Sequence, residues 1–285
     1  MMNYRVDTLE LGAFTTESGE KIENLKLQYE HVGYPGQPLV LVCHALTGNH
    51  LTYGTEENPG WWREIIDGGY MPLHDYQFLT FNVIGSPFGS SSRVTDQNFP
   101  QHLTMRDIAH ALEKGIEALG FRKIDVLIGG SLGGMQALEL LYRHKFEVEK
   151  AVILAATAKT SSYSRAFNEI ARQAIHIAGK EGLSIARQLG FLTYRSSKSY
   201  EARFTPDEVV TYQKYQGDKF KEQFDLQCYL TLLDVLDSHD IYRGRENVDK
   251  VYQSLNTKVL TLGFTDDLLY PDDIIGVQQI LSLIH

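Results

Sequence analysis

Short apolar segments that alternate with amphipathic ones constrain the fold of this chain more than any other feature of its sequence. Six segments have the length and residue types of β-strands, namely 25–32, 38–43, 78–84, 124–128, 151–154 and 258–262. The run Leu39–Cys43 is apolar throughout, which is typical of a strand buried on both faces of a sheet. Segment 105–119 has its apolar residues at helical spacing. The alternation therefore predicts an α/β fold with a mostly parallel sheet flanked by helices.

The segment from 158 to 256 does not follow this pattern, because it is polar, helical in spacing and almost free of strand-like runs. It is also much longer than an ordinary crossover connection. We therefore expect residues 1–157 and 257–285 to form the α/β core, and 158–256 to form an inserted helical lid. Ligands in open α/β sheets bind at the carboxyl ends of the strands, so the lid is expected to cover that edge.

The composition argues against several classes of protein. The 285 residues carry a net charge of −9 and no basic cluster, which argues against nucleic-acid binding. The apolar runs fall far short of the roughly 20 residues that a membrane-spanning helix needs, and the N-terminus lacks the apolar stretch of a secretory signal. Two cysteines and dispersed histidines favour neither a disulfide framework nor a metal site. We expect a cytoplasmic protein without membrane, nucleic-acid or metal partners.

The sharpest local motif is Gly129-Gly130-Ser131-Leu132-Gly133, which follows one predicted strand and precedes a predicted helix. This is the pattern G-x-S-x-G in the strand–turn–helix context of a catalytic serine. Small neighbours let the hydroxyl stand clear of a strained turn, and the helix N-terminus offers N–H groups to an oxyanion. A capping serine or a phosphate-binding loop is the alternative, but the Gly-Lys-Ser/Thr ending of a P-loop is absent. We predict Ser131 as the nucleophile and the Leu132 amide as one oxyanion donor.

Segment 43–48 follows the early strand 38–43. In the architecture that G-x-S-x-G indicates, the loop after such a strand supplies the second oxyanion donor. We assign that role to the backbone of Leu46. His44 in the same loop is expected to be buried and hydrogen-bonded, so that it orients the loop without titrating.

Two adjacent carboxylates follow the late strand 258–262. The order of a serine nucleophile and then an acid at the end of a late strand resembles that of α/β-hydrolases. We predict Asp266 as the acid of the catalytic group. Asp267 is one residue further along the chain, so its side chain is expected to point away from that of Asp266 and to serve as a turn or capping carboxylate.

Several motifs along the chain together resemble the homoserine O-acetyltransferase family. They are His44-Ala45-Leu46-Thr47-Gly48, Gly60-Trp61-Trp62, Asn82-Val83-Ile84-Gly85, the 129–134 turn followed by Met135-Gln136-Ala137, and in the predicted lid Gly182-Leu183-Ser184-Ile185-Ala186-Arg187, Leu192-Thr193-Tyr194-Arg195 and Phe224-Asp225 with Tyr229-Leu230. The resemblance implies an α/β-hydrolase fold whose helical lid often mediates a homodimer. It also implies transfer of an acetyl group from acetyl-CoA to the side-chain hydroxyl of L-homoserine, in methionine biosynthesis, with no bound cofactor.

The resemblance also assigns substrate-binding roles in the lid. Arg187 corresponds to the residue that holds the carboxylate of homoserine, a task that suits the planar fork of a guanidinium group. Arg172 is a second, weaker candidate on the same lid, and Tyr194 and Tyr229 are expected to line the pocket. The implied mechanism is a ping-pong reaction, in which the acetyl group passes from CoA to Ser131 and then to homoserine.

The C-terminal part of the sequence departs from the family pattern. The catalytic histidine of the family lies in a Gly-His-Asp motif whose Asp binds the substrate amine, and that tripeptide occurs nowhere in this sequence. His285 is the histidine that follows Asp266 along the chain, and a terminal residue is a poor general base because it is mobile. We therefore expect a truncated or frame-shifted chain with impaired transferase activity, because a serine triad without its histidine loses several orders of magnitude in rate.

Other functions on the same scaffold stay open at this point. An O-succinyltransferase or a serine O-acyltransferase would differ in a few pocket residues. A carboxylesterase would share G-x-S-x-G, although a polar lid with Arg187 argues against a lipid substrate. A non-catalytic binding protein would keep the fold and lack the base.

Overall fold

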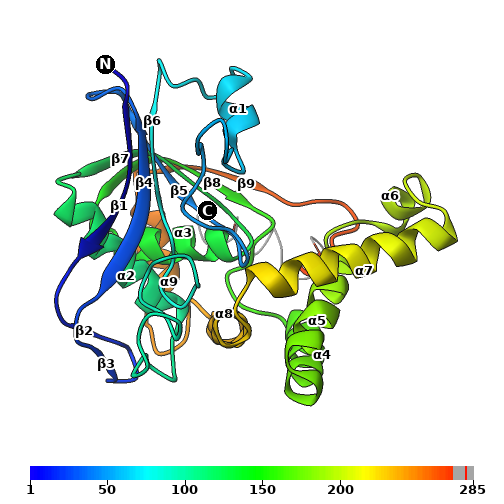
Figure 1. Cartoon of the computed structure of the whole chain (residues 1–285). Coiled ribbons are helices and arrows are strands. Elements are labelled where there is room, and N and C mark those ends of the chain that lie inside the picture. The colour runs from blue at the N-terminus through cyan, green and yellow to red at the C-terminus, as the bar shows by residue number, and fades with distance from the viewer. Residues whose placement is uncertain (272–279, 281–285) are drawn as a thin grey trace.

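The computed structural model describes residues 1–271 and residue 280. A seven-stranded sheet forms its centre, in the order β1-β4-β6-β5-β7-β8-β9 (Figure 1). Its strands are β1 (Asn3–Glu10), β4 (Lys26–Gly33), β5 (Leu39–Cys43), β6 (Gln77–Phe81), β7 (Lys123–Gly130), β8 (Glu147–Leu154) and β9 (Lys258–Leu262). β4 pairs antiparallel with β1 and β6, and the other neighbours pair in parallel. A separate pair consists of β2 (Phe14–Thr15) and β3 (Lys21–Ile22).

All six predicted strands are present, and their pairing confirms the mostly parallel sheet. β5 lies between β6 and β7 and is buried along its whole length. Leu41 and Cys43 pack into the main core, whereas Val40 and Val42 pack into a smaller cluster. Because successive strand residues point to opposite faces, both faces of β5 are covered. β1 is a strand that the sequence does not predict, because it is an edge strand with no fully buried residue and hence no apolar face.

Helices cover both faces of the sheet. The core helices are α1 (Arg63–Asp67), α2 (Met105–Ala118), α3 (Leu132–Arg143) and α9 (Val248–Gln253). α3 packs against β5, β7 and β8, and α2 and α9 pack against α3. α2 begins at a capping box, in which the side chains of Thr104 and Asp107 each accept the other's backbone N–H. α1 contributes Ile66 to the smaller cluster, together with Val40 and Val42.

Five consecutive helices after β8 lie in the segment that the sequence predicts as a lid, and together they are called the lid. They are α4 (Ser162–Ala178), α5 (Lys180–Thr193), α6 (Ser197–Glu201), α7 (Pro206–Gln223) and α8 (Leu226–Ser238). α5 packs against α4 and α7, and these helices project to one side of the sheet (Figure 1). α8 contacts α4 and also the core helix α2, so it joins the lid to the core. The predicted insertion 158–256 also contains α9, which packs on α3 of the core.

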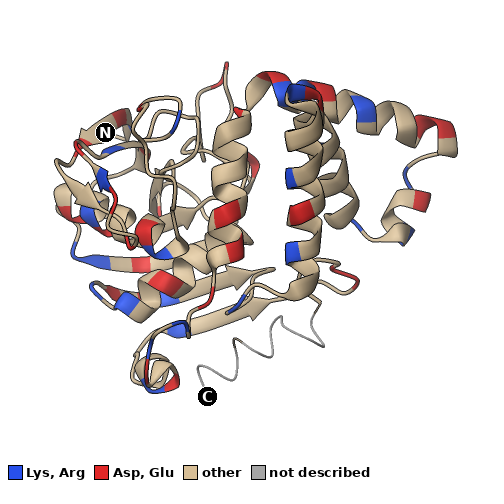
Figure 2. Ribbon diagram, turned by 90° about the horizontal axis from the view of Figure 1, so that it is seen from below, with Lys and Arg blue, Asp and Glu red and all other residues tan. Residues whose placement is uncertain are grey.

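Positions of Lys and Arg alternate with those of Asp and Glu along the ribbon (Figure 2). On the lid, Lys221 pairs with Glu181 at 2.8 Å and Lys180 pairs with Glu222 at 2.9 Å, which links α5 to α7. Exposed pairs of this kind contribute about 0–1 kcal/mol each, so apolar packing has to supply most of the lid's stability. Within residues 1–271 and 280, no helix has the length and hydropathy needed to cross a bilayer. The same residues contain no cluster of three His, Cys, Asp or Glu side chains that could hold a metal ion.

Candidate active site

Ser131 lies at the sharp turn between β7 and α3. Its backbone has φ 55° and ψ −123°, a left-handed conformation that side chains other than glycine rarely adopt. The turn is tight on both sides, because a Cβ on Gly129 would lie 2.2 Å from the Gly133 carbonyl oxygen, and one on Gly133 would lie 2.0 Å from that of Cys43. Both glycines of G-x-S-x-G are therefore required, because neighbouring backbone leaves no room for a side chain. The strained backbone conformation lies at Ser131, the predicted nucleophile.

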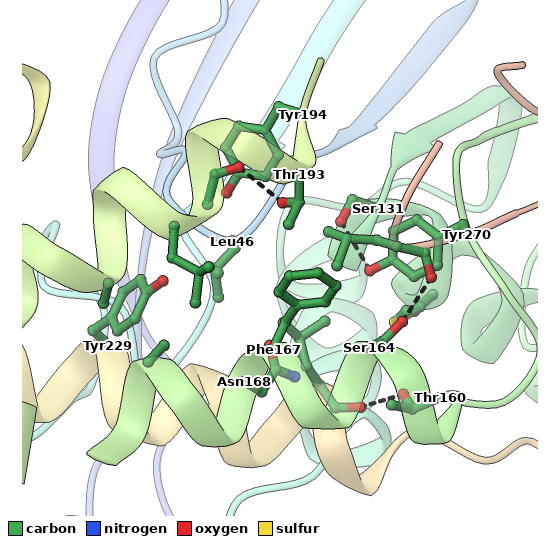
Figure 3. Close-up of a pocket in the computed structure, with 17 residues that line it drawn as sticks. Leu46, Ser131, Thr160, Ser164, Phe167, Asn168, Thr193, Tyr194, Tyr229 and Tyr270 are labelled. Atoms are coloured by element: carbon green, nitrogen blue, oxygen red, sulfur yellow. Dashed lines mark hydrogen bonds between the residues drawn. The ribbon is translucent and has the colours of Figure 1, made fainter. Parts of the chain in front are cut away.

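The hydroxyl of Ser131 does not cap the helix. Ser131 occupies the N-cap position of α3, yet its side chain makes no capping hydrogen bond, which removes the capping-serine interpretation. Its backbone N–H donates to the Leu154 carbonyl oxygen at 2.9 Å, which fixes the turn to β8. Its Oγ lies 3.3 Å from the hydroxyl of Tyr270 (Figure 3). The hydroxyl is thus available to a substrate at the amino end of a helix.

Two adjoining cavities meet at Ser131. The small cavity of about 60 Å³ lies under the lid, and the large cavity of about 730 Å³ lies between the lid and the loop after β9. The residues that line both are Leu46, Ser131, Thr193, Tyr194, Leu269 and Tyr270. Tyr229 lines the small cavity, and Arg187 and Asp266 line the large one. The structure therefore brings together the predicted nucleophile, acid, oxyanion loop and lid residues around one centre.

The predicted oxyanion donors flank the nucleophile. Leu46 lines both cavities with Ser131, and Leu132 is the next residue along the chain. Within the described part of the chain, neither amide N–H has a hydrogen-bond partner. Their role as oxyanion donors stays a prediction that this arrangement supports.

His44 is a buried residue that holds segment 43–48, the loop that we predict to supply an oxyanion donor and call the oxyanion loop. Its Nδ1 lies 2.8 Å from the Ala45 carbonyl oxygen, and its Nε2 accepts the Val83 N–H at 3.0 Å. Its own carbonyl oxygen accepts from the side-chain amide of Gln136 at 3.0 Å. Burial lowers the pKa of His44 to about 4, so the ring is neutral and Nδ1 donates. His44 therefore has the buried, hydrogen-bonded surroundings expected of a residue that orients the loop.

Buried histidines make stability sensitive to acid. Burial lowers the pKa of His44, His50 and His239 from 6.5 to about 4. These histidines take up protons near pH 6.5 in the unfolded chain and near pH 4 in the folded chain. The free energy of unfolding should therefore be highest above pH 6.5 and decrease as the pH falls from 6.5 to 4. Each histidine accounts for at most about 3 kcal/mol of the loss. Urea unfolding across this range measures it.

The control for this prediction is Ser254→Ala, which removes a hydroxyl and no titratable group and should leave the pH dependence unchanged. His239→Gln should make the profile shallower, because it removes a group that titrates differently in the folded and unfolded chains. A free energy of unfolding that stays constant between pH 6.5 and 4 would contradict the prediction.

The two carboxylates after β9 have different surroundings. Asp267 accepts the backbone N–H groups of Leu269 at 2.8 Å and Tyr270 at 3.0 Å, so it is the turn carboxylate that the sequence predicts. Asp266 is exposed, has φ 68°, and lines the large cavity. Its carboxylate accepts no hydrogen bond from another described residue, and its role as the catalytic acid stays a prediction.

Arg187 lies beside the oxyanion loop. Its Nη1 donates to Thr47 Oγ1 at 3.2 Å, and its guanidinium group lies 4.6 Å from the centre of the Phe191 ring and 4.7 Å from that of Phe220. It is half-buried, and in the described residues no carboxylate forms an ion pair with it. A half-buried cation without an internal counter-charge is suited to binding a substrate carboxylate. Arg187 therefore does not lie on a solvated helix face.

Arg172 has a structural role instead. Its guanidinium group pairs with Glu169 at 2.7 Å, Asp234 at 2.9 Å and Asp237 at 2.8 Å, which ties α4 to α8. Arg172 lines neither cavity at Ser131. The weaker substrate-binding candidate is therefore wrong, because its charge is neutralised within the lid.

Tyr270 is a site residue to which the sequence assigned no role. It is buried, and its hydroxyl is the hydrogen-bond partner of Ser131 Oγ. The sequence carries one indirect signal, since the turn at Asp267 ends at Tyr270 and fixes its backbone. The contact itself joins positions 139 residues apart, and no local pattern reports it.

The cavities and the turn agree with the comparisons to known proteins. The family model described as the alpha/beta hydrolase fold matches residues 38–274. The chain is 32% identical to a homoserine O-acetyltransferase of Carboxydothermus hydrogenoformans over 90% of this chain and 80% of the relative, and 35% identical to one of Thermus thermophilus over 90% and 78%. The solved structure of homoserine O-acetyltransferase from Staphylococcus aureus matches with a TM-score of 0.93 and 77% identity, over 95% of this chain and 83% of that one. The chain therefore has the α/β-hydrolase fold and belongs to the homoserine O-acetyltransferase family.

Proposed function

We propose that this protein transfers an acetyl group from acetyl-CoA to the side-chain hydroxyl of L-homoserine, a step of methionine biosynthesis. The observation that carries the proposal is that Ser131 and Arg187 line one cavity. A serine placed at a helix N-terminus can take up an acyl group, and an arginine that pairs with no described carboxylate can hold an acceptor that bears one. The names of the relatives supply the acceptor, homoserine, and the acetyl group. Acetyl-CoA is the donor that the sequence resemblance implies.

The small cavity favours a short, uncharged acyl group. Its lining includes apolar side chains such as Met135, Phe167 and Leu189, and none of the described residues that line it is Lys, Arg or His. A succinyl group would bring a carboxylate into this space without a counter-charge, which is costly in a buried apolar setting. Acetyl is therefore the donor group that we propose.

The reaction runs in two halves. Ser131 Oγ attacks the thioester carbon, the amides of Leu46 and Leu132 stabilise the oxyanion, and CoA leaves as the thiol. The hydroxyl of homoserine, held through its carboxylate by Arg187, then attacks the acetyl-serine. Tyr194 borders both cavities and lies where donor and acceptor have to meet. The lid keeps water from competing with the acceptor.

The histidine base implied by the family resemblance has no Gly-His-Asp counterpart in the 285 residues. Within residues 1–271 and 280, the hydrogen-bond partner of Ser131 Oγ is Tyr270 and not a histidine. The acetyl-Ser131 intermediate is the most direct observable.

The experiment is release of free thiol from acetyl-CoA, measured with and without L-homoserine. Release that depends on homoserine supports the proposal. Parallel reactions with succinyl-CoA as donor and with L-serine as acceptor test the two related transferases. Release that does not depend on any acceptor would favour a hydrolase, and binding of both substrates without release would favour a non-catalytic protein.

We also propose that the lid mediates a homodimer. It exposes large apolar side chains on two helices, Ile170 and Ile177 on α4 and Val210 and Tyr215 on α7. Exposed apolar groups of this kind are typical of interaction surfaces. Sedimentation velocity should give the mass of two 32.3 kDa chains, and Ile177→Glu should shift the protein toward one. A single-chain mass for the unaltered protein at all concentrations would contradict the proposal.

A further inference from the structure

Among the described residues, the side chain that contacts the hydroxyl of Ser131 is a tyrosine and not a histidine. Tyr270 Oη lies 3.3 Å from Ser131 Oγ, and Figure 3 shows the two hydroxyl groups facing each other at the edge of the small cavity. Within residues 1–271 and 280, neither hydroxyl has another hydrogen-bond partner. The two hydroxyl groups therefore pair with each other, and no wider hydrogen-bond network among the described residues accounts for their contact.

The Tyr270 backbone is fixed from two directions. On the core side, the carboxylate of Asp267 accepts its N–H at 3.0 Å. On the lid side, Ser164 Oγ of α4 donates to the carbonyl oxygen of Leu269 at 2.7 Å (Figure 3). The ring itself is buried. A hydroxyl held in this way is preorganised toward Ser131 Oγ and needs no rearrangement during a reaction.

The chemistry of the two hydroxyl groups decides which of them donates the hydrogen bond. Burial raises the pKa of Tyr270 to about 12, so the phenol keeps its proton at neutral pH. A serine Oγ that carries an acyl group has no proton left and can act only as an acceptor. In an acyl-enzyme, the hydrogen bond between these oxygens therefore runs from Tyr270 to Ser131.

We propose that Tyr270 is a further catalytic residue, which donates a hydrogen bond to Ser131 Oγ in the step where this oxygen leaves the acetyl group. The proposal rests on the acetyl-transfer function proposed above. In this step the acceptor hydroxyl oxygen forms a bond to the acetyl carbon, the bond from that carbon to Oγ breaks, and its electron pair stays on Oγ. The proton that the acceptor oxygen loses is the one that Oγ gains, and Tyr270 keeps its own.

The two half-reactions should depend on Tyr270 unequally. When Oγ leaves, negative charge develops on it, and a donated hydrogen bond stabilises that charge. When Oγ attacks the thioester, it gives up electron density, and a donated hydrogen bond does not help it. A purely structural role of Tyr270 would affect both halves alike, so the ratio of the two rates separates the explanations.

The test is Tyr270→Phe, which keeps the ring and removes the hydroxyl. The rate at which homoserine discharges the acetyl-enzyme should fall about 10-fold to 100-fold, as expected for the loss of one hydrogen bond to a charged oxygen. The rate of acetyl-enzyme formation from acetyl-CoA should change far less. Rapid quenching and intact-protein mass spectrometry follow both steps, and the variant should accumulate acetyl-Ser131.

Tyr252→Phe is the matched control. Tyr252 is also buried, and its hydroxyl donates to the Leu138 carbonyl oxygen at 2.8 Å, outside both cavities. Its loss should lower stability without changing the ratio of the two rates. If Tyr270→Phe does not fold, Ser164→Ala replaces it, because it frees the Leu269 carbonyl that positions Tyr270 and should slow the same step to a smaller extent.

The outcomes separate the two proposals. Selective slowing of discharge in Tyr270→Phe supports the role of Tyr270. Equal rates of discharge in the variant and the unaltered protein, or equal slowing of both steps, would overturn it while leaving the acetyl-transfer function in place. Absence of acetyl-Ser131 and of homoserine-dependent thiol release in the unaltered protein would overturn both.

Discussion

Ser131→Ala should eliminate the acetyl-enzyme and lower homoserine-dependent thiol release to the rate measured without protein. The reason is that the variant has no oxygen to attack the thioester, while the lid, the oxyanion loop and Arg187 stay in place. Intact-protein mass spectrometry after incubation with acetyl-CoA measures the intermediate directly. Ser254→Ala is the control, since it removes a serine hydroxyl at the end of α9 outside both cavities. Acetylation that persists in Ser131→Ala would show that another residue is the nucleophile.

A second substitution at the same position separates the loss of activity from the relief of backbone strain. Ser131 has φ 55°, which glycine adopts without steric cost. Ser131→Gly should therefore be as inactive as Ser131→Ala yet more stable than it by about 1 kcal/mol, because relief of 1–3 kcal/mol of strain exceeds the entropy that glycine loses on folding. Urea unfolding of the two variants compares them. Equal stability of the two variants would mean that the turn carries no strain.

The strained turn at Ser131 and the loop at Leu46 could be located from the sequence because their determinants are local. The conformation of Ser131 requires small residues two positions away on either side, and these are adjacent in the sequence. The loop at Leu46 follows a strand that is apolar on both faces, and such a strand lies at the centre of a sheet. Backbone geometry of this kind restricts the residue types of the segment that forms it, so the sequence of that segment predicts it.

The remaining parts of the site depend on contacts that no short segment records. Arg172 and Arg187 are both arginines on lid helices, and the sequence alone offers only the family resemblance to rank them. Their difference comes from Asp234 and Asp237 on α8, which neutralise Arg172, whereas no described carboxylate pairs with Arg187. The contact of Tyr270 with Ser131 likewise depends on how the loop after β9 packs under α4. Tertiary packing decides such pairings, and local residue patterns do not report it.

The second large effect is expected at Arg187. Arg187→Ala should lower kcat/KM for homoserine about 30-fold to 1,000-fold, because removing the partner of a half-buried carboxylate costs about 2–4 kcal/mol. Arg187→Lys should lose less, since it keeps the charge and loses the planar fork. The loss should appear as a raised KM for homoserine and should be confined to the second half-reaction, because acetyl-CoA acylates Ser131 before the acceptor binds. Steady-state kinetics with both substrates varied, combined with the acylation rate, measures this division.

Two controls decide whether Arg187 acts on the acceptor or through the oxyanion loop. Thr47→Val removes the hydrogen bond that Arg187 makes to the loop and leaves the guanidinium group in the cavity. If Arg187 binds the acceptor, Thr47→Val should leave KM for homoserine nearly unchanged, whereas slower acylation in both Thr47→Val and Arg187→Ala would assign Arg187 to loop support. Arg172→Ala removes a lid arginine of equal charge that faces three carboxylates. It should lower stability without a selective rise in that KM, because charge alone does not bind the acceptor unless it lines the cavity that contains Ser131.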